Sequence, residues 1–244
     1  RDWSSDVCSS DLIKELAALS FDNQIWQDAW NFLNASLPYY DQDDENESKE
    51  LAKVFYKLGR VAEKMGNMEI ALKHYNESYK RDSDSLECLE SLSDAYYARE
   101  DWEQAFRFYQ TILVRVRANK TTEQLVGLFC RLGEINGKIQ KHEIAVRMYE
   151  KALEIDPNSV IALSESVKYY ESLERWAKVI KYRVTLAKLL TKEESFGQWV
   201  AIGDIYAERL KQKREGLEAY KRAMMVKARL YASNPSRFCL RRSA

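Results

Sequence analysis

Apolar residues recur at helical spacing along most of this chain, and the recurrence itself repeats. Residues 126–157 show it best, because two apolar faces are separated there by a short polar stretch. At about 100° per residue each set falls on one side of a helix. The pattern predicts two antiparallel amphipathic helices, the second ended by Pro157. The residues that face each other are Phe129, Leu132 and Gly133 in the first helix and Ala145, Tyr149 and Ala152 in the second.

The same arrangement returns along the sequence. Small residues at Ala71, Ala105 and Ala145 are each followed, four positions later, by a tyrosine. A shorter version leads the chain around Ala29, and two more hairpins follow Pro157. One hairpin cannot bury its apolar face alone, so we expect the hairpins to stack on one another.

These spacings resemble the tetratricopeptide repeat, a 34-residue helix–turn–helix unit. The resemblance implies an all-α fold, a right-handed α-solenoid of stacked hairpins. It identifies an architecture better than a function, because surface residues set the partner of such a scaffold. The implied division is a partial unit at 13–37, an acidic insertion at 38–51, and repeats at 52–85, 86–125 (with an insertion), 126–159, 160–193 (degenerate) and 194–231.

Both ends of the chain stand outside this pattern. Residues 1–12, RDWSSDVCSSDL, resemble the translation of a sequencing adapter, and the alternative is a natural polar N-terminus. We therefore expect 1–12 to be non-native and the native sequence to begin near Ile13. Pro235 interrupts the repeat that should open at 232–244, which we interpret as a truncated or frame-shifted end. The chain is then expected to be a fragment of a longer repeat protein.

Three spacings depart from the 34-residue period. The acidic stretch 41–50 adds eight residues, and we expect a solvated loop there, with a docking site for a basic partner as the alternative. Six extra residues around 115–122 are expected to lengthen a helix end and its loop. One extra residue is expected in the turn near 210–214.

Composition excludes several functions. Lys plus Arg equals Asp plus Glu at 38 each, so no overall charge indicates a nucleic-acid partner. The basic stretch 208–242 is better explained as solvated helix surface than as an RNA or membrane surface. No apolar run is long enough to span a bilayer. We expect a cytoplasmic protein, although the segment that would carry a targeting signal is expected to be missing.

The sequence contains no constellation that predicts catalysis or a bound cofactor. The four cysteines form no CxxC pair, and His74 and His142 occupy different repeats at different positions. Glycines fit helix packing and turns rather than a phosphate loop. We therefore expect no catalytic residues, no metal, no cofactor and no enzyme activity within this chain.

Three functional classes remain. The leading hypothesis is a non-catalytic scaffold that binds a peptide or protein segment in its groove. The alternatives are a substrate-recruiting arm of a larger enzyme and a structural spacer in a multiprotein assembly. The partner of the scaffold is expected to be a protein or peptide of basic or mixed charge.

The first helices of successive repeats are expected to line the groove with positions 2, 5, 9 and 12 of each unit. Seven of these twenty positions are acidic and three are basic, so the groove is expected to be net negative, and Glu90, Asp94 and Glu134 would surround a basic or mixed peptide. Gly127 and Gly137 weaken their helix, which would be explained by a ligand approaching the backbone closely. The groove residues expected from this spacing are Lys53, Tyr56, Arg60, Glu87, Glu90, Asp94, Tyr97, Glu134, Lys168 and Asp204.

One subfamily is excluded by the same positions. Tetratricopeptide domains that hold the C-terminal carboxylate of heat-shock chaperones resemble one another at positions 5 and 9. They use Lys at position 5 and Asn at position 9 of one repeat, Asn at position 9 of the next, and then Lys at position 5 and Arg at position 9. No consecutive set here fits, so we expect no binding to a peptide that ends in Glu-Glu-Val-Asp. The residues present are Tyr56 and Arg60, Glu90 and Asp94, Cys130 and Glu134, Ser164 and Lys168, and Val200 and Asp204.

Overall fold

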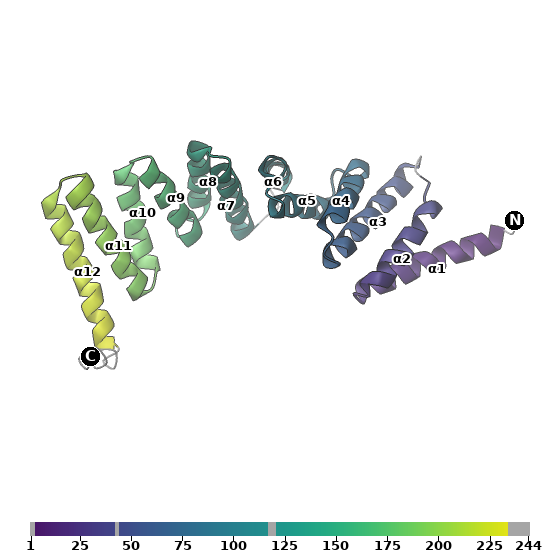
Figure 1. The fold of residues 1–244 in the computed structure, drawn as a ribbon, viewed down its shortest axis with the longest axis horizontal. Coiled ribbons are helices and arrows are strands. Elements are labelled where there is room, and N and C mark those ends of the chain that lie inside the picture. The colour runs from purple at the N-terminus through teal and green to yellow at the C-terminus, as the bar shows by residue number, and fades with distance from the viewer. Residues whose placement is uncertain (1–2, 42–43, 117–120, 234–244) are drawn as a thin grey trace. The chain divides into compact units, whose positions relative to one another are not determined.

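The computed structural model describes residues 3–41, 44–116 and 121–233, and within these ranges it contains helices and turns but no strand. The expectation of an all-α fold is confirmed (Figure 1). The helices are α1 (Trp3–Asp22), α2 (Trp26–Ser36), the 3-10 turn η1 (Leu37–Tyr39), α3 (Glu45–Lys64), α4 (Met68–Arg81), α5 (Leu86–Ala98), α6 (Trp102–Val116), α7 (Thr122–Lys138), α8 (His142–Ile155), α9 (Val160–Ser172), α10 (Trp176–Leu189), α11 (Lys192–Asp204), the π turn η2 (Ile205–Arg209) and α12 (Lys213–Ser233).

The chain divides into two compact units, unit 1 at 1–117 and unit 2 at 118–244. Each unit contains three consecutive helical hairpins in its described part, α1 to α6 in unit 1 and α7 to α12 in unit 2. Within a unit, the second helix of one hairpin also packs on the first helix of the next. This stacking buries the apolar faces that a lone hairpin would expose.

A tyrosine ring lies flat on a glycine in three of the hairpins. A Cβ placed on Gly59 would lie 2.4 Å from the ring of Tyr75, and one on Gly133 would lie 2.8 Å from Tyr149. Gly203 meets Tyr220 in the same way, at 2.5 Å. These positions therefore require glycine, because a side chain there would collide with the tyrosine ring. In the hairpin of α7 and α8, the residue that requires glycine at position 133 is Tyr149.

The turns between paired helices share one conformation. A single residue after the first helix takes a positive φ, as Gly66 does at 80° and Gln140 at 61°. The next amide then donates to a carbonyl five residues back, from Asn67 to Ala62 and from Lys141 to Asn136, each at 2.8 Å. This is the Schellman end of a helix. It turns the chain so that the second helix starts against the first. The other turn residues with positive φ are Gln24, Glu100, Glu174 and Lys211.

The extra residue of the last hairpin lies in a π turn. The amide of Leu210 donates to the carbonyl of Ile205, five residues back, at 3.0 Å, and the amide of Gln212 reaches six residues back to Tyr206 at 2.7 Å. A π turn holds one residue more than an α turn at the same helix position. We expected this residue near 210–214, and the structure places it at 205–209, at the end of α11.

The described part of the acidic stretch 41–50 is largely exposed, as expected, but from Glu45 onward it is helix rather than loop, which corrects that part of the expectation. The Asp44 side chain accepts hydrogen bonds from the amides of Asn46 and Glu47, so α3 begins at Glu45 and its acids occupy the favourable N-terminal end. Leu51 is already buried in this extension. In the second insertion, Thr121 and Gln124 form a capping box that starts α7 at Thr122, so helix lengthening is confirmed there. Residues 117–120 lie outside the described ranges.

The terminal segments are only partly described. Residues 3–12 form the first half of α1, and among the side chains of α1 that the structure describes, from Ser10 onward, Ala17 and Ser20 are buried. Residues 1–2 and 234–244, and with them most of the segment that we interpret as truncated or frame-shifted, lie outside the described ranges.

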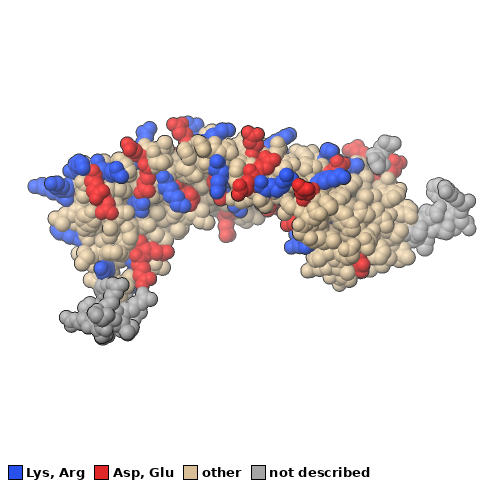
Figure 2. Space-filling view, viewed as in Figure 1, with Lys and Arg blue, Asp and Glu red and all other residues tan. Residues whose placement is uncertain are grey.

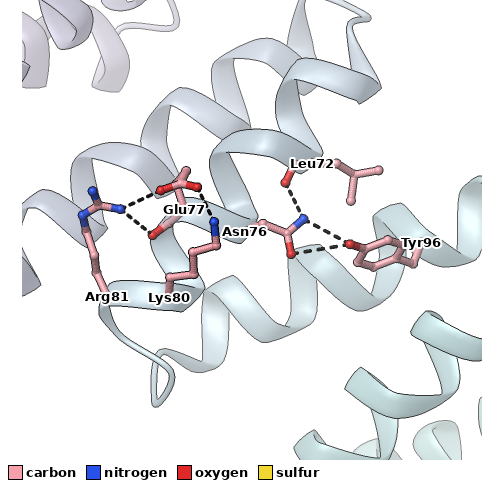
Figure 3. Close-up of polar contacts among 6 residues, drawn as sticks. All are labelled: Leu72, Asn76, Glu77, Lys80, Arg81 and Tyr96. Carbon is pink, nitrogen blue, oxygen red and sulfur yellow. Dashed lines mark hydrogen bonds and ion pairs between the residues drawn. The ribbon is translucent and has the colours of Figure 1, made fainter.

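A polar contact joins two hairpins of unit 1. The Asn76 side chain on α4 donates to the hydroxyl of Tyr96 on α5 at 3.1 Å and to the carbonyl of Leu72 at 2.8 Å (Figure 3). The next residue of α4, Glu77, pairs with Arg81 at 2.9 Å and with Lys80 at 2.7 Å. The half-buried amide thereby fixes the position of α5 beside α4.

Candidate functional site

A hollow of about 730 Å³ lies in unit 2 between the first helices α7 and α9. All four expected groove positions of α7 line it, together with two from α9, Ile161 and Lys168. Positions 2, 5, 9 and 12 of α7 therefore share one open face. Its lining residues are Gly127, Cys130, Arg131, Glu134, Gly137, Lys138, Tyr149, Ile161, Glu165, Lys168 and Tyr169.

The spacing argument missed part of this lining. Arg131, Lys138, Glu165 and Tyr169 lie one residue beyond an expected position, and Tyr149 comes from the second helix α8. A hollow between two helices has side walls as well as a floor, and the residue next to each floor position forms a wall. Charged and aromatic residues beside the expected positions were the available signal.

The charges in the hollow are mixed and partly paired. Arg131 lies 3.3 Å from Glu134, and Lys168 lies 2.5 Å from Glu165. With Lys138 the lining carries three basic and two acidic side chains. Over the visible surface of α7 to α12, Figure 2 likewise shows Lys and Arg interspersed with Asp and Glu. The chemistry of the hollow therefore suits a ligand that carries both signs of charge.

Gly127 and Gly137, the two glycines of α7 at expected groove positions, have different explanations. A Cβ on Gly127 would meet nothing within 4 Å, so this backbone is open to the hollow. A Cβ on Gly137 would lie 1.6 Å from the hydroxyl of Tyr169. The structure thus corrects our interpretation of Gly137, since a tyrosine from α9 occupies its side-chain space.

Cys130 lines this hollow, and its thiol is a potential nucleophile. Burial, and then the nearby Glu165 carboxylate, raise the pKa of its thiol to about 11. The thiol is therefore protonated at neutral pH, which makes it a poor nucleophile. Among the described residues no group of three or more His, Cys, Asp or Glu side chains could hold a metal ion.

An aromatic row closes one side of the hollow. The ring of Tyr169 on α9 stacks on that of Tyr149 on α8 with centroids 5.9 Å apart. The ring of His142, at the start of α8, has its centroid 5.5 Å from that of Tyr169. Burial is the main cause that raises the pKa of both tyrosine hydroxyls. Both tyrosines are neutral at physiological pH. Tyr149 is buried against Gly133, whereas Tyr169 is partly exposed and can offer a ring face and a hydroxyl to a ligand.

Seven of the expected groove residues belong to unit 1. On α3, Lys53 pairs with Glu50 at 2.6 Å, Arg60 lies 3.8 Å from Glu63, and the ring of Tyr56 lies 5.9 Å from that of Tyr75. On α5, Glu87, Glu90 and Asp94 follow one another on the expected face, where Asp94 accepts a hydrogen bond from the Tyr109 hydroxyl. Tyr97 packs edge-on against Trp102 at 5.3 Å.

The remaining three expected residues belong to unit 2. The structure brings Glu134 and Lys168 into one hollow, whereas Asp204 lies on α11 and does not line it. Asp204 accepts a hydrogen bond of 2.6 Å from Tyr220, and this bond is the main cause that raises the pKa of the tyrosine to about 12. In each unit, a tyrosine on a second helix thus fixes a carboxylate at a groove position: Tyr109 fixes Asp94 in unit 1, and Tyr220 fixes Asp204 in unit 2.

A family model described as the tetratricopeptide repeat matches residues 52–85 and 126–159. None of the curated proteins matches the chain in sequence. A crystal structure of MamA is 18% identical with a TM-score of 0.53, and the match covers 72% of this chain and 97% of that one. YrrB, titled a TPR protein with an unusual peptide-binding site, is 17% identical with a TM-score of 0.54, covering 75% and 90%. MamA from Desulfovibrio magneticus RS-1 is 18% identical with a TM-score of 0.52, covering 72% and 95%.

Consecutive helical hairpins with an open face on their first helices define an α-solenoid of helical repeats. The segments 52–85 and 126–159 are tetratricopeptide repeats, and the fold of the chain is similar to that of MamA and of the TPR protein YrrB. None of its described helices is long and apolar enough to cross a membrane.

Proposed function

We propose that this chain is a non-catalytic scaffold that binds a peptide or protein segment on the faces of its first helices. The hollow between α7 and α9 carries the proposal. It combines an open backbone at Gly127, the ring of Tyr169 and charged side chains of both signs, and these groups together suit a peptide. YrrB, a protein of the same fold, is described as having a peptide-binding site.

The proposed partner of this hollow carries mixed charge. Glu134 and Glu165 would attract basic side chains, and Arg131, Lys138 and Lys168 would attract acidic ones. In unit 1, Glu90 and Asp94 with Tyr56 and Tyr97 would hold basic or mixed segments. Because these contacts are near the surface, binding should weaken as salt screens the charges.

A matched pair of glycine variants tests the proposal. Gly127 and Gly197 occupy the same position of α7 and α11, and a side chain on either would meet nothing within 4 Å. Only Gly127 lines the hollow. Peptides enriched from a library by the wild-type protein should bind the Gly127→Phe variant at least ten-fold more weakly, because the ring fills the hollow.

Gly197→Phe is the control, and it should leave the affinity for peptides selected at the hollow unchanged. Circular dichroism should show the same helix content for both variants. The proposal fails if no peptide is enriched over its scrambled sequence, or if all enriched peptides bind Gly127→Phe as tightly as the wild type.

A further inference from the structure

A second hollow, of about 130 Å³, lies in unit 1 where α1, α2 and α3 meet. Lys14 from α1 and Lys53 and Lys57 from α3 surround it, over a floor that includes Leu33 and Val54. Glu50 is the only carboxylate in the lining, and it pairs with Lys53 at 2.6 Å. The hollow therefore has two more positive than negative groups.

The other two lysines are held by aromatic rings. The Nζ of Lys14 lies 4.3 Å from the ring centre of Tyr40, and that of Lys57 lies 5.4 Å from the ring centre of Phe21. Within the part of the chain that the structure describes, neither lysine has an ion pair with a carboxylate. A ring orients an ammonium group without neutralising it, so its N–H donors still favour an anion.

This hollow lies on the same kind of face as the groove of unit 2. Lys14 precedes the buried Ala17 by three residues, as Tyr56 precedes Gly59. Lys53 and Lys57 correspond in their repeat to Gly127 and Arg131, which line the hollow of unit 2. The basic hollow is therefore an extension of the first-helix face of unit 1 toward α1.

The opposite charge lies on the next first helix of the same unit. On α5, the three groove positions Glu87, Glu90 and Asp94 are all acidic. The Tyr109 hydroxyl donates to Asp94 and so fixes one of the three carboxylates. From α1 to α5, the first-helix face of unit 1 thus changes from basic to acidic.

We propose that the first-helix face of unit 1 recognises a peptide by the order of its charges. An acidic side chain enters the hollow formed by Lys14, Lys53 and Lys57, and a basic side chain contacts Glu87, Glu90 and Asp94. The first helices α3 and α5 both pack on α4. Taking about 10 Å, the distance between neighbouring helix axes, for each step between successive first helices puts α5 about 15 Å from the hollow between α1 and α3. At about 3.3 Å per extended residue, the two charges of the peptide are four to five residues apart.

This proposal rests on the proposed peptide-binding function and specifies its partner in unit 1. The probes are ten-residue peptides, acetylated and amidated so that terminal charges play no part. Each carries an Asp pair and an Arg pair, separated by four residues or placed side by side. Fluorescence anisotropy should show at least ten-fold tighter binding for the separated pairs than for adjacent pairs or for peptides with either pair replaced by Ser.

The double variant Lys14→Glu with Lys57→Glu should reverse the preference. It should lose at least ten-fold in affinity for the Asp–Arg peptide and gain affinity for a peptide in which Arg replaces the Asp pair. A loss of folding cannot produce this gain. The double variant Lys73→Glu with Lys80→Glu makes the same change in net charge on α4, outside the hollow, and should keep the wild-type preference.

The possible failures are distinguishable. If the Asp–Arg peptide binds and the Lys14 and Lys57 reversals leave its affinity unchanged, the charge order is wrong while peptide binding stands. If none of the peptides binds unit 1 but the hollow of unit 2 passes its own test, the proposal for unit 1 is overturned alone. If neither unit binds any peptide, both proposals are overturned.

Discussion

At the scale of single residues, glycines of one helix serve opposite purposes. Gly133 of α7 receives the ring of Tyr149, and Gly127, less than two turns earlier, opens onto the hollow. The degenerate hairpin supports this pairing of glycine with tyrosine. Where its glycine would stand it has Val167, and where its tyrosine would stand it has Arg183. A ring and the space that receives it are thus lost together.

Alanine at these two glycines should have effects of opposite sign. Gly133→Ala should lower the free energy of unfolding by about 1–3 kcal/mol, because the ring of Tyr149 must shift from a packed position. Gly127→Ala should raise it by up to about 1 kcal/mol, because alanine favours a helix and meets no neighbour. Urea denaturation measures both. Equal effects would show that the ring does not need the glycine.

His74 is a half-buried group whose charge unit 1 does not accommodate. Its ring stacks on Phe55 at 5.9 Å and meets Trp30 edge-on at 5.5 Å, and its Nδ1 is buried without a hydrogen bond. Burial, then the charge of Lys73, lower the pKa of His74, and Glu77 opposes them only in part. The folded chain therefore favours the neutral imidazole.

Acid should destabilise unit 1 through this residue. The unfolded chain takes up the proton near the ordinary histidine pKa of about 6.5, and the folded chain does so only at lower pH. Stability is therefore fully present above that pH and falls as the pH drops below it. His74→Phe should remove this part of the pH dependence in thermal melts between pH 7.5 and 5. His142→Phe, on the exposed start of α8, should retain it, and identical pH profiles for all three proteins would contradict the assignment.

At the scale of elements, the hairpin turn is the repeated device. One residue with positive φ and one amide bonded five residues back set each of the first five turns. Only Gly66 has the residue type that this conformation favours, whereas Gln140 and Glu174 adopt it as ordinary residues. The last turn keeps the residue with positive φ, at Lys211, but the next amide bonds six residues back, because its hairpin has one residue more. The turn conformation is therefore imposed by the packing of the two helices.

Reciprocal substitutions at two turns should show the free-energy cost of a residue other than glycine at positive φ. Gly66→Ala should lower the free energy of unfolding by about 1 kcal/mol, because alanine is strained at φ 80°. Gln140→Gly should raise it by a few tenths to about 1 kcal/mol, because glycine adopts this conformation without strain. Chemical denaturation of the two variants beside the wild type measures both changes. If Gln140→Gly is destabilising, the glutamine side chain contributes more than its backbone strain costs.

At the scale of the whole molecule, stability is the sum of hairpins and the contacts between neighbours. Buried clusters follow the division of the chain. One, around Leu58 and Val61, belongs to unit 1, and another, around Leu163 and Tyr182, belongs to unit 2. Each unit thus has apolar packing of its own.

The two units should therefore fold separately. A fragment of residues 13–116 keeps Ala17 and Ser20, the buried residues among the described side chains of α1, and a fragment of 121–233 keeps all three hairpins of unit 2. Each should show helical circular dichroism and a cooperative thermal transition. A fragment that is unstructured on its own would show that its stability depends on the other unit.

The fold could be predicted from the sequence because its signal is local. Apolar residues at helical spacing, and small residues at Ala71, Ala105 and Ala145, depend on contacts within one hairpin or between neighbours. The floor of the hollow was predicted for the same reason, since Gly127, Cys130 and Glu134 follow one helix face. The walls were missed. Glu165 and Tyr169 come from the following hairpin, and their direction depends on how α9 packs beside α7.

The sequence by itself determined the helices, their pairing and the face that each first helix presents, because these follow from period and spacing. Tertiary structure decided what individual residues do on that face. From the sequence, Gly137 and Gly127 were equally expected to expose their backbone, whereas in the structure the hydroxyl of Tyr169 occupies the space beside Gly137. Asp94 and Asp204 were groove acids in the sequence, and tyrosines from the second helices hold both. The acidic stretch 45–50 is helix because Asp44 caps it and the next residue, Leu51, is buried. In each case the outcome depends on a contact with a residue distant along the chain, or on the geometry of a helix cap. The period of the apolar residues carries no information about such contacts.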